Sequence, residues 1–146
     1  MGDETPPERR VAEALLRHLQ GIFIDMESVE RTALFPANRQ ESLVVEFDTV
    51  YYPDSIGTVR LELRVYTNGD FHITYLETHL GERRYCRWGR HDQNHNSQDH
   101  FHPLPSASTA KAVDKTFPSD VTMMLRQHVL PWIDERLGDL WDADSM

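Results

Sequence analysis

The sequence contains a single cysteine, Cys86, in 146 residues. One cysteine can form neither an internal disulfide nor a zinc cage of several thiolates, so both kinds of site are excluded. No apolar run approaches the roughly 18 residues that a membrane-spanning helix needs. The first residues, MGDETPPE, lack the basic and apolar regions of a secretory signal. We therefore expect a soluble, cytoplasmic protein that makes no membrane contact.

Lysine is also scarce, because Lys111 and Lys115 are the only lysines among 15 basic residues, against 24 acidic ones. The formal charge of −9 argues against nucleic-acid binding over the whole surface. An acidic, lysine-poor composition suits a halophilic protein that stays soluble in concentrated salt. Residues 58–102 differ from the rest, since they hold six arginines, six acidic residues and six of the eight histidines. We expect the functional site to lie in this charge-neutral segment.

A helix is predicted near the N-terminus. Thr5, Pro6 and Glu8 form a helix-start pattern of N-cap, first-turn proline and capping-box glutamate. An apolar stripe of helical period follows, and Gly21 is the predicted stop. The next residues, 22–24, are all apolar and indicate a short first strand.

The middle of the chain predicts strands. Residues 42–52 are rich in β-branched and aromatic side chains, and two alternating segments, 59–65 and 71–75, follow. A three-residue loop, 67–69, sets apolar residues opposite apolar residues, whereas a two-residue loop would set them opposite polar ones. Gly69 then takes the left-handed position of a bulged hairpin. The predicted pairs are Val65 with Phe71, Leu63 with Ile73, and Leu61 with Tyr75.

The same alternation predicts a polar face on the other side of the sheet. A further strand is predicted over 83–90, with Cys86 and Trp88 pointing inward. Four arginines on one face of an acidic protein suggest an anion-binding surface, although a solvated outer face with cross-strand charge pairs is the alternative. The candidate substrate-binding residues on this face are Arg64, His72, Arg83 and Tyr85.

Residues 89–118 show no regular apolar period, which predicts a long loop that is His-rich at first and linker-like over 104–117. A C-terminal helix follows, with Ser119 as its predicted N-cap. Pro131 should kink this helix near Gln127, because proline removes one backbone hydrogen bond.

Together these elements predict one α+β domain over residues 1–146, with flexible ends at 1–4 and 142–146. Its parts are an N-terminal helix, an antiparallel sheet of four to five strands, a His-rich loop and a kinked C-terminal helix. Trp132 and Trp141 give the last helix an apolar surface suited to a homodimer or a protein partner.

The densest chemistry lies in residues 87–103, which contain four histidines, two arginines and two aspartates. Histidine is the side chain best suited to move protons near neutral pH, and arginine matches phosphate oxygens. One hypothesis is metal-free cleavage of RNA, with histidines as general base and general acid and an arginine on the phosphate. The candidate catalytic residues are His91, His95, His100, His102, Arg87 and Arg90.

Two other interpretations of this segment stay open. The first is a divalent metal site with His95, Asp99, His100 and His102 as ligands, although their spacing matches no zinc signature. In the second, the histidines are structural and hold a loop through backbone hydrogen bonds. No other cofactor is predicted.

The segment is also similar to a known family. The succession of Tyr85, Arg87-Trp88, His95-Asn96 and Asp99-His100-Phe101-His102-Pro103 resembles the toxins of TumE-type toxin–antitoxin pairs, in particular small acidic relatives from salt-loving archaea. The resemblance covers residues 58–103 well and the flanking helices in outline, and the long linker and extended C-terminal helix depart from the commoner form. It implies a toxin whose partner is a cognate antitoxin protein.

The leading hypothesis is therefore a toxin that cleaves RNA, by analogy with other small intracellular toxins. The alternative is a non-enzymatic binding module, either an antitoxin-like partner or a metal-stabilised scaffold. A further alternative is an inhibitor that mimics nucleic acid through its acidic surface.

Overall fold

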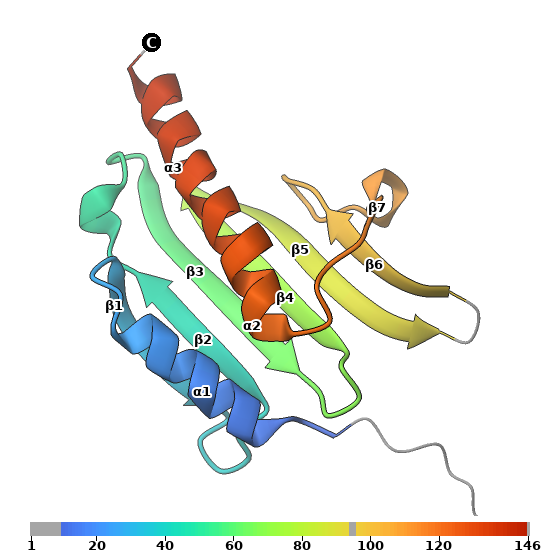
Figure 1. Cartoon of the computed structure of the whole chain (residues 1–146). Coiled ribbons are helices and arrows are strands. Elements are labelled where there is room, and N and C mark those ends of the chain that lie inside the picture. Colours follow the sequence, from blue (N-terminus) through green and yellow to red (C-terminus); the bar gives the residue numbers. More distant parts are fainter. Residues whose placement is uncertain (1–9, 94–95, 146) are drawn as a thin grey trace, which may run out of the picture.

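The computed structural model describes residues 10–93 and 96–145. In chain order its elements are α1 (Glu13–Ile24), β1 (Val29–Phe35), β2 (Ser42–Phe47), η1 (Thr49–Tyr51), β3 (Ile56–Val65), β4 (Phe71–His79), β5 (Glu82–Gln93), β6 (Asn96–His102), η2 (Thr109–Lys111), β7 (Val113–Lys115), α2 (Val121–Met124), η3 (Leu125–Val129) and α3 (Leu130–Asp144). Within these ranges the strands form one antiparallel sheet whose order follows the chain from β1 to β7 (Figure 1).

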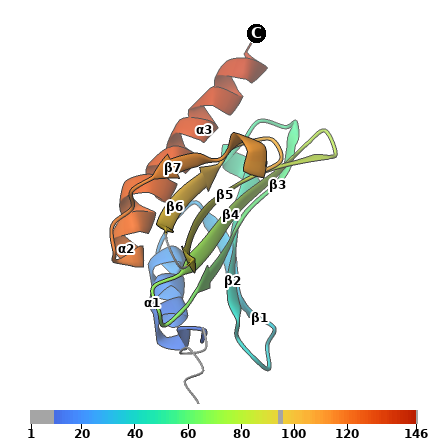
Figure 2. The same ribbon diagram turned by 90° about the vertical axis from the view of Figure 1, so that its right-hand side faces the viewer.

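The fold has two layers, because α1 and α3 both lie against the same face of the sheet and leave the other face uncovered (Figure 2). Helix α1 buries Leu16, Leu19 and Phe23, which recur at helical spacing. The opposite wall of the core comes from the inward positions of β2 to β5. No helix in the described part of the chain is both long and apolar enough to cross a membrane.

The central hairpin has the predicted register. Val65 pairs with Phe71, Leu63 with Ile73 and Leu61 with Tyr75, and all six side chains are buried. Gly69 has a φ of 93°, the left-handed conformation that glycine adopts without a steric penalty. A single-residue slip would turn this whole apolar set toward solvent, which is why the pattern specifies the register so strongly.

The N-terminal helix differs from its prediction. The expected start at Thr5, Pro6 and Glu8 lies outside the described residues. The expected stop at Gly21 is wrong, because α1 continues to Ile24. The segment 22–24 is therefore the last turn of this helix and not a strand. The reason is packing: Phe23 lies four residues after Leu19 on the same stripe and is fully buried.

The sheet is larger than predicted, with seven described strands where four to five were expected. The region 89–118 is also not a long loop, because β5 and β6 form a hairpin there and β7 adds to its edge. Its strands were missed because the inward side chains of β6 include the buried carboxylate of Asp99 as well as Phe101. One polar and one apolar inward position produce no apolar alternation.

The C-terminal helical segment begins one residue later than predicted, since Asp120, and not Ser119, accepts a hydrogen bond from the backbone N–H of Thr122. The segment is interrupted near Gln127, where a π-helical turn spans Leu125–Val129. Pro131 follows in the first turn of α3 and has no N–H to donate to the preceding turn. Helix α3 continues to Asp144, through residues expected to be a flexible end.

A buried carboxylate joins α3 to the sheet. Glu77 on β4 is completely buried and accepts hydrogen bonds from Arg136 on α3, from Arg84 on β5 and from the Tyr75 hydroxyl. Burial alone would raise the pKa of Glu77, but the bonds from Arg136, Arg84 and Tyr75 hold it below its ordinary value. Glu77 is therefore ionised at neutral pH and fixes α3 across the sheet.

Candidate functional site

The uncovered face of the sheet carries a line of polar residues that crosses the strands. Arg64 on β3 pairs with His72 on β4, and His72 pairs with Gly89 on β5. Gly89 in turn pairs with His100 on β6. Residues two apart along a strand point to the same face, so His91 and His102 join this line from β5 and β6.

Four imidazole rings follow one another on this face, and we call them the histidine row: His72, His91, His100 and His102. The ring centroids are 5.4 Å apart for His72 and His91, 5.8 Å for His91 and His100, and 6.1 Å for His100 and His102. Gly89 lies under the first two rings, because a Cβ at this position would be 3.6 Å from His72 Nδ1 and 3.9 Å from His91 Nε2. These are ordinary van der Waals distances, so the two rings lie directly over the Gly89 backbone.

The members of the row differ in environment. His102 is only 6% exposed, and its Nδ1 is buried without a hydrogen-bond partner. Burial lowers the pKa of His102, and the neighbouring charges of Arg87, His100 and His91 lower it further. His100 is more open, and its Nδ1 lies 3.2 Å from Asp114 Oδ1 on β7. At neutral pH the row therefore contains at least one uncharged ring.

The lowered pKa of His102 predicts an acid-sensitive contribution to stability. This contribution is complete above the unfolded pKa of about 6.5 and is lost as the pH falls through the lower folded value. We expect His102→Gln to lose less unfolding free energy than the wild type between about pH 7.5 and about pH 5. Urea unfolding at both pH values measures this difference. Exposed His18→Gln should behave like the wild type, and equal pH dependence in all three proteins would contradict the assignment.

A shallow pocket of about 330 Å³ adjoins the row. We call it the arginine pocket, and its lining residues are Glu62, Arg64, Tyr66, His72, Thr74 and Arg87. His72 belongs to both the pocket and the row. Its ring contacts Tyr66 edge-on at a centroid distance of 6.3 Å and His91 at 5.4 Å. The pocket offers two guanidinium groups against one carboxylate, which favours an anion.

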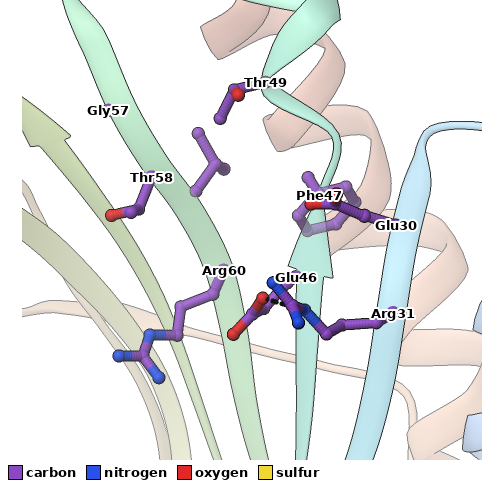
Figure 3. Close-up of a pocket in the computed structure, with 9 residues that line it drawn as sticks. Glu30, Arg31, Glu46, Phe47, Thr49, Gly57, Thr58 and Arg60 are labelled. Carbon is purple, nitrogen blue, oxygen red and sulfur yellow. Dashed lines mark hydrogen bonds and ion pairs between the residues drawn. The ribbon is translucent and has the colours of Figure 1, made fainter.

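A second pocket of about 320 Å³ lies over β1 to β3 (Figure 3). We call it the outer pocket. Arg31 and Glu46 form an ion pair at 2.5 Å on one side of it, and Arg60 extends beside them. The Arg60 guanidinium is 3.8 Å from the carboxylate of Glu62, which lines the arginine pocket. This ion pair is a common wall between the two pockets.

Comparison with known families assigns the chain. The family model described as "Toxin TumE" matches residues 13–137, which include every described member of the site. The chain belongs to the TumE toxin family. It is thus the toxin component of a toxin–antitoxin pair, and an antitoxin is its partner. No curated protein and no solved structure gives a significant match.

Most of the predicted site residues of this TumE toxin lie on the uncovered face. His72, His91, His100 and His102 form the row, while Arg64 and Arg87 line the pocket beside it. Arg83 and Tyr85 share the face but lie farther along β5, where they pair with Thr78 and Leu76. His95 lies outside the described residues.

Arg90 and Asp99 are separated from the row, which corrects their assignment to the catalytic and metal-binding candidates. Both point to the helix-covered side, where Arg90 donates two hydrogen bonds to the Asp99 carboxylate. Arg90 also bonds the carbonyls of Phe117 and Pro118, and Asp99 accepts the Phe117 N–H. This pair anchors the chain ahead of α2. In the part of the toxin that the structure describes, no three His, Cys, Asp or Glu side chains are grouped to hold a metal ion.

Two contributors to the site were not identified from the sequence. Tyr66 is the next outward position after Arg60, Glu62 and Arg64, so continuing the alternation past the end of the apolar strand would have found it. No pattern in the sequence identifies Gly89 as part of the site. Its role depends on the cross-strand pairing with His72 and His100, which only the register of three strands reveals.

Proposed function

We propose that this toxin is a metal-independent ribonuclease that cleaves RNA with its histidine row. The observation that carries the proposal is the contact between four successive imidazoles and a pocket with two arginines, on a face that no helix of the described residues covers. Cleavage of RNA without a metal needs a proton acceptor, a proton donor and a cation close to one phosphate. These three kinds of group are adjacent here.

The reaction proceeds by attack of the ribose on its own phosphate. The general base removes the proton of the 2′-hydroxyl, and the 2′-oxygen forms a bond to phosphorus. The bond between phosphorus and the 5′-oxygen breaks, and the general acid protonates that oxygen. The products are a 2′,3′-cyclic phosphate and a 5′-hydroxyl, so no water, metal ion or oxidant is consumed in this step.

His91 and His100 are the best candidates for the two proton-transfer roles. Their rings are neighbours in the middle of the row, 5.8 Å apart, and both are half-buried, so a substrate can reach them. His102 is nearly inaccessible and packs beside His100. We assign it as a positioning residue. Arg64 and Arg87 bind the phosphate and stabilise the charge that grows on it in the transition state.

The acidic remainder of the chain is compatible with an RNA substrate. The net charge of −9 repels polyanions at long range, but salt at about 0.15 M screens exposed charges beyond about 8 Å. A salt-rich cytoplasm, which we propose as the working environment, screens this repulsion further. Direct contacts of a phosphate with Arg64 and Arg87 act at short range, where screening weakens an interaction less than it weakens the long-range repulsion.

The proposal predicts the chemistry of the cleaved ends. Purified toxin should cut a short synthetic RNA in the presence of excess chelator and leave 2′,3′-cyclic phosphate and 5′-hydroxyl ends, identified by mass spectrometry. The same oligonucleotide with a 2′-deoxyribose at the cleavage position should remain intact there, because it lacks the nucleophile. Cleavage that stops with chelator, or that continues at the 2′-deoxy position, would contradict the mechanism.

A further inference from the structure

The uncovered face provides two adjoining pockets that are lined by arginines. The outer pocket contains Arg31 and Arg60 together with two glutamates, and the arginine pocket contains Arg64 and Arg87 against one glutamate. Arg60 and Glu62 form the wall between them, and the histidine row begins at the far side of the arginine pocket. These elements follow one another across the strands from β1 toward β6, so they form a track longer than one nucleotide.

We infer that this track binds single-stranded RNA, laid across the strands, and rejects duplex RNA. That the bound strand is also the substrate rests on the proposed function. The preference for single-stranded over duplex RNA does not, because it concerns binding alone.

The first argument is the shape of the face. The pockets are shallow and small, about 320 and 330 Å³, and they lie on an open sheet surface. In A-form duplex RNA the bases are paired and stacked, so they cannot enter such pockets, and proteins read duplex RNA through its wide minor groove instead. An unpaired strand can turn individual bases toward a flat protein surface. RNA-recognition domains that bind RNA on a β-sheet depend on this.

The second argument is the position of Tyr66. Its ring lines the arginine pocket and is half-buried, with the His72 ring perpendicular to it at an interplanar angle of 85°. An aromatic ring beside two guanidinium groups is the combination that single-strand binding proteins use, with the cations on the backbone and the ring stacked on a base. A paired base cannot stack in this way without leaving the helix.

The binding preference also has a consequence for cleavage under the proposed function. Attack by the 2′-oxygen requires that it lie in line with the bond from phosphorus to the 5′-oxygen. The A-form backbone holds the 2′-hydroxyl away from that line, whereas an unpaired nucleotide can rotate into it. A track that binds only unpaired strands therefore selects the conformers that the histidine row can cleave.

The preference is tested by binding, with no need for cleavage. The probe is a fluorescent RNA whose riboses are all 2′-O-methylated, so that it cannot react, offered to the full-length toxin either alone or annealed to its complement. We expect the single strand to bind at least about tenfold more tightly, measured by anisotropy at one fixed salt concentration. Equal or tighter binding of the duplex would overturn the inference. Preferred binding of the single strand without cleavage of unmodified RNA would support the inference and overturn the ribonuclease proposal.

Variants locate the binding on the track. Tyr66→Leu removes the stacking ring and should weaken single-strand binding about tenfold, whereas Tyr66→Phe keeps the ring and should bind like the wild type. Arg60→Gln should weaken binding and reduce its salt dependence, because one phosphate contact is lost. The matched control is Arg126→Gln, since Arg126 is exposed on η3 in the helical layer. Wild-type affinity in both Tyr66→Leu and Arg60→Gln would place the strand elsewhere and overturn the inference.

Discussion

Replacing His100 with glutamine is expected to lower the initial rate of RNA cleavage by at least about a hundredfold. His100 lies between His91 and His102 in the row, and glutamine can donate and accept hydrogen bonds but cannot exchange a proton near neutral pH. The rate is measured on a short RNA by gel electrophoresis. His18→Gln, on an exposed position of α1, is the matched control and should cleave like the wild type.

The same variant separates proton transfer from positioning. If His91 and His100 are the acid and base, each single glutamine variant should remove one limb of the bell-shaped dependence of kcat/KM on pH. His102→Gln should lower the rate but keep both limbs, because His102 acts through His100. A His100→Gln protein that is folded by circular dichroism and cleaves within tenfold of the wild-type rate would remove His100 from the chemistry.

The second large effect concerns stability. Glu77→Gln is expected to lower the free energy of unfolding by about 3–5 kcal/mol, the typical cost of removing one partner from a buried ion pair. The change leaves Arg84 and Arg136 beside a neutral amide, with side chains only 26% and 19% exposed. The Tyr75 hydroxyl also loses its charged acceptor.

Urea unfolding monitored by tryptophan fluorescence measures this loss, because Trp132 lies on α3 and contacts Tyr75 and Trp88. Glu13→Gln is the matched control, since Glu13 is exposed in the first turn of α1 and should change stability by less than about 0.5 kcal/mol. A loss below about 1 kcal/mol in Glu77→Gln would mean that α3 is held by apolar packing alone.

The parts of the fold that could be predicted are those in which polarity alternates cleanly. The register of the β3–β4 hairpin was predicted correctly, because slipping it would expose Leu63 and Ile73. That register also placed Arg64 opposite His72, which located the centre of the site. The β6 strand was not predictable in the same way, since the charge on inward-facing Asp99 is neutralised only by Arg90 from the neighbouring strand.

The candidate site also has one part that could be predicted from the sequence and one part that could not. The alternation that turns Trp88 inward also turns Arg90 inward, so its separation from the row could have been inferred from the sequence. The succession of rings in the row could not, because it depends on side chains from three strands. Pairing between β5 and β6 brings His100 beside His91, and the Gly89 backbone lies under His72 and His91. Such juxtapositions follow from tertiary pairing and leave no local pattern.

The most direct test of the central claim is made in cells. The toxin is expressed without its antitoxin, as wild type and as His100→Gln, while growth and the 5′-hydroxyl ends of cellular RNA are followed together. We predict that the wild type arrests growth as these ends accumulate, and that His100→Gln produces neither effect at equal protein level. Growth arrest by both proteins with intact RNA would contradict the account and show that this toxin acts without its histidine row.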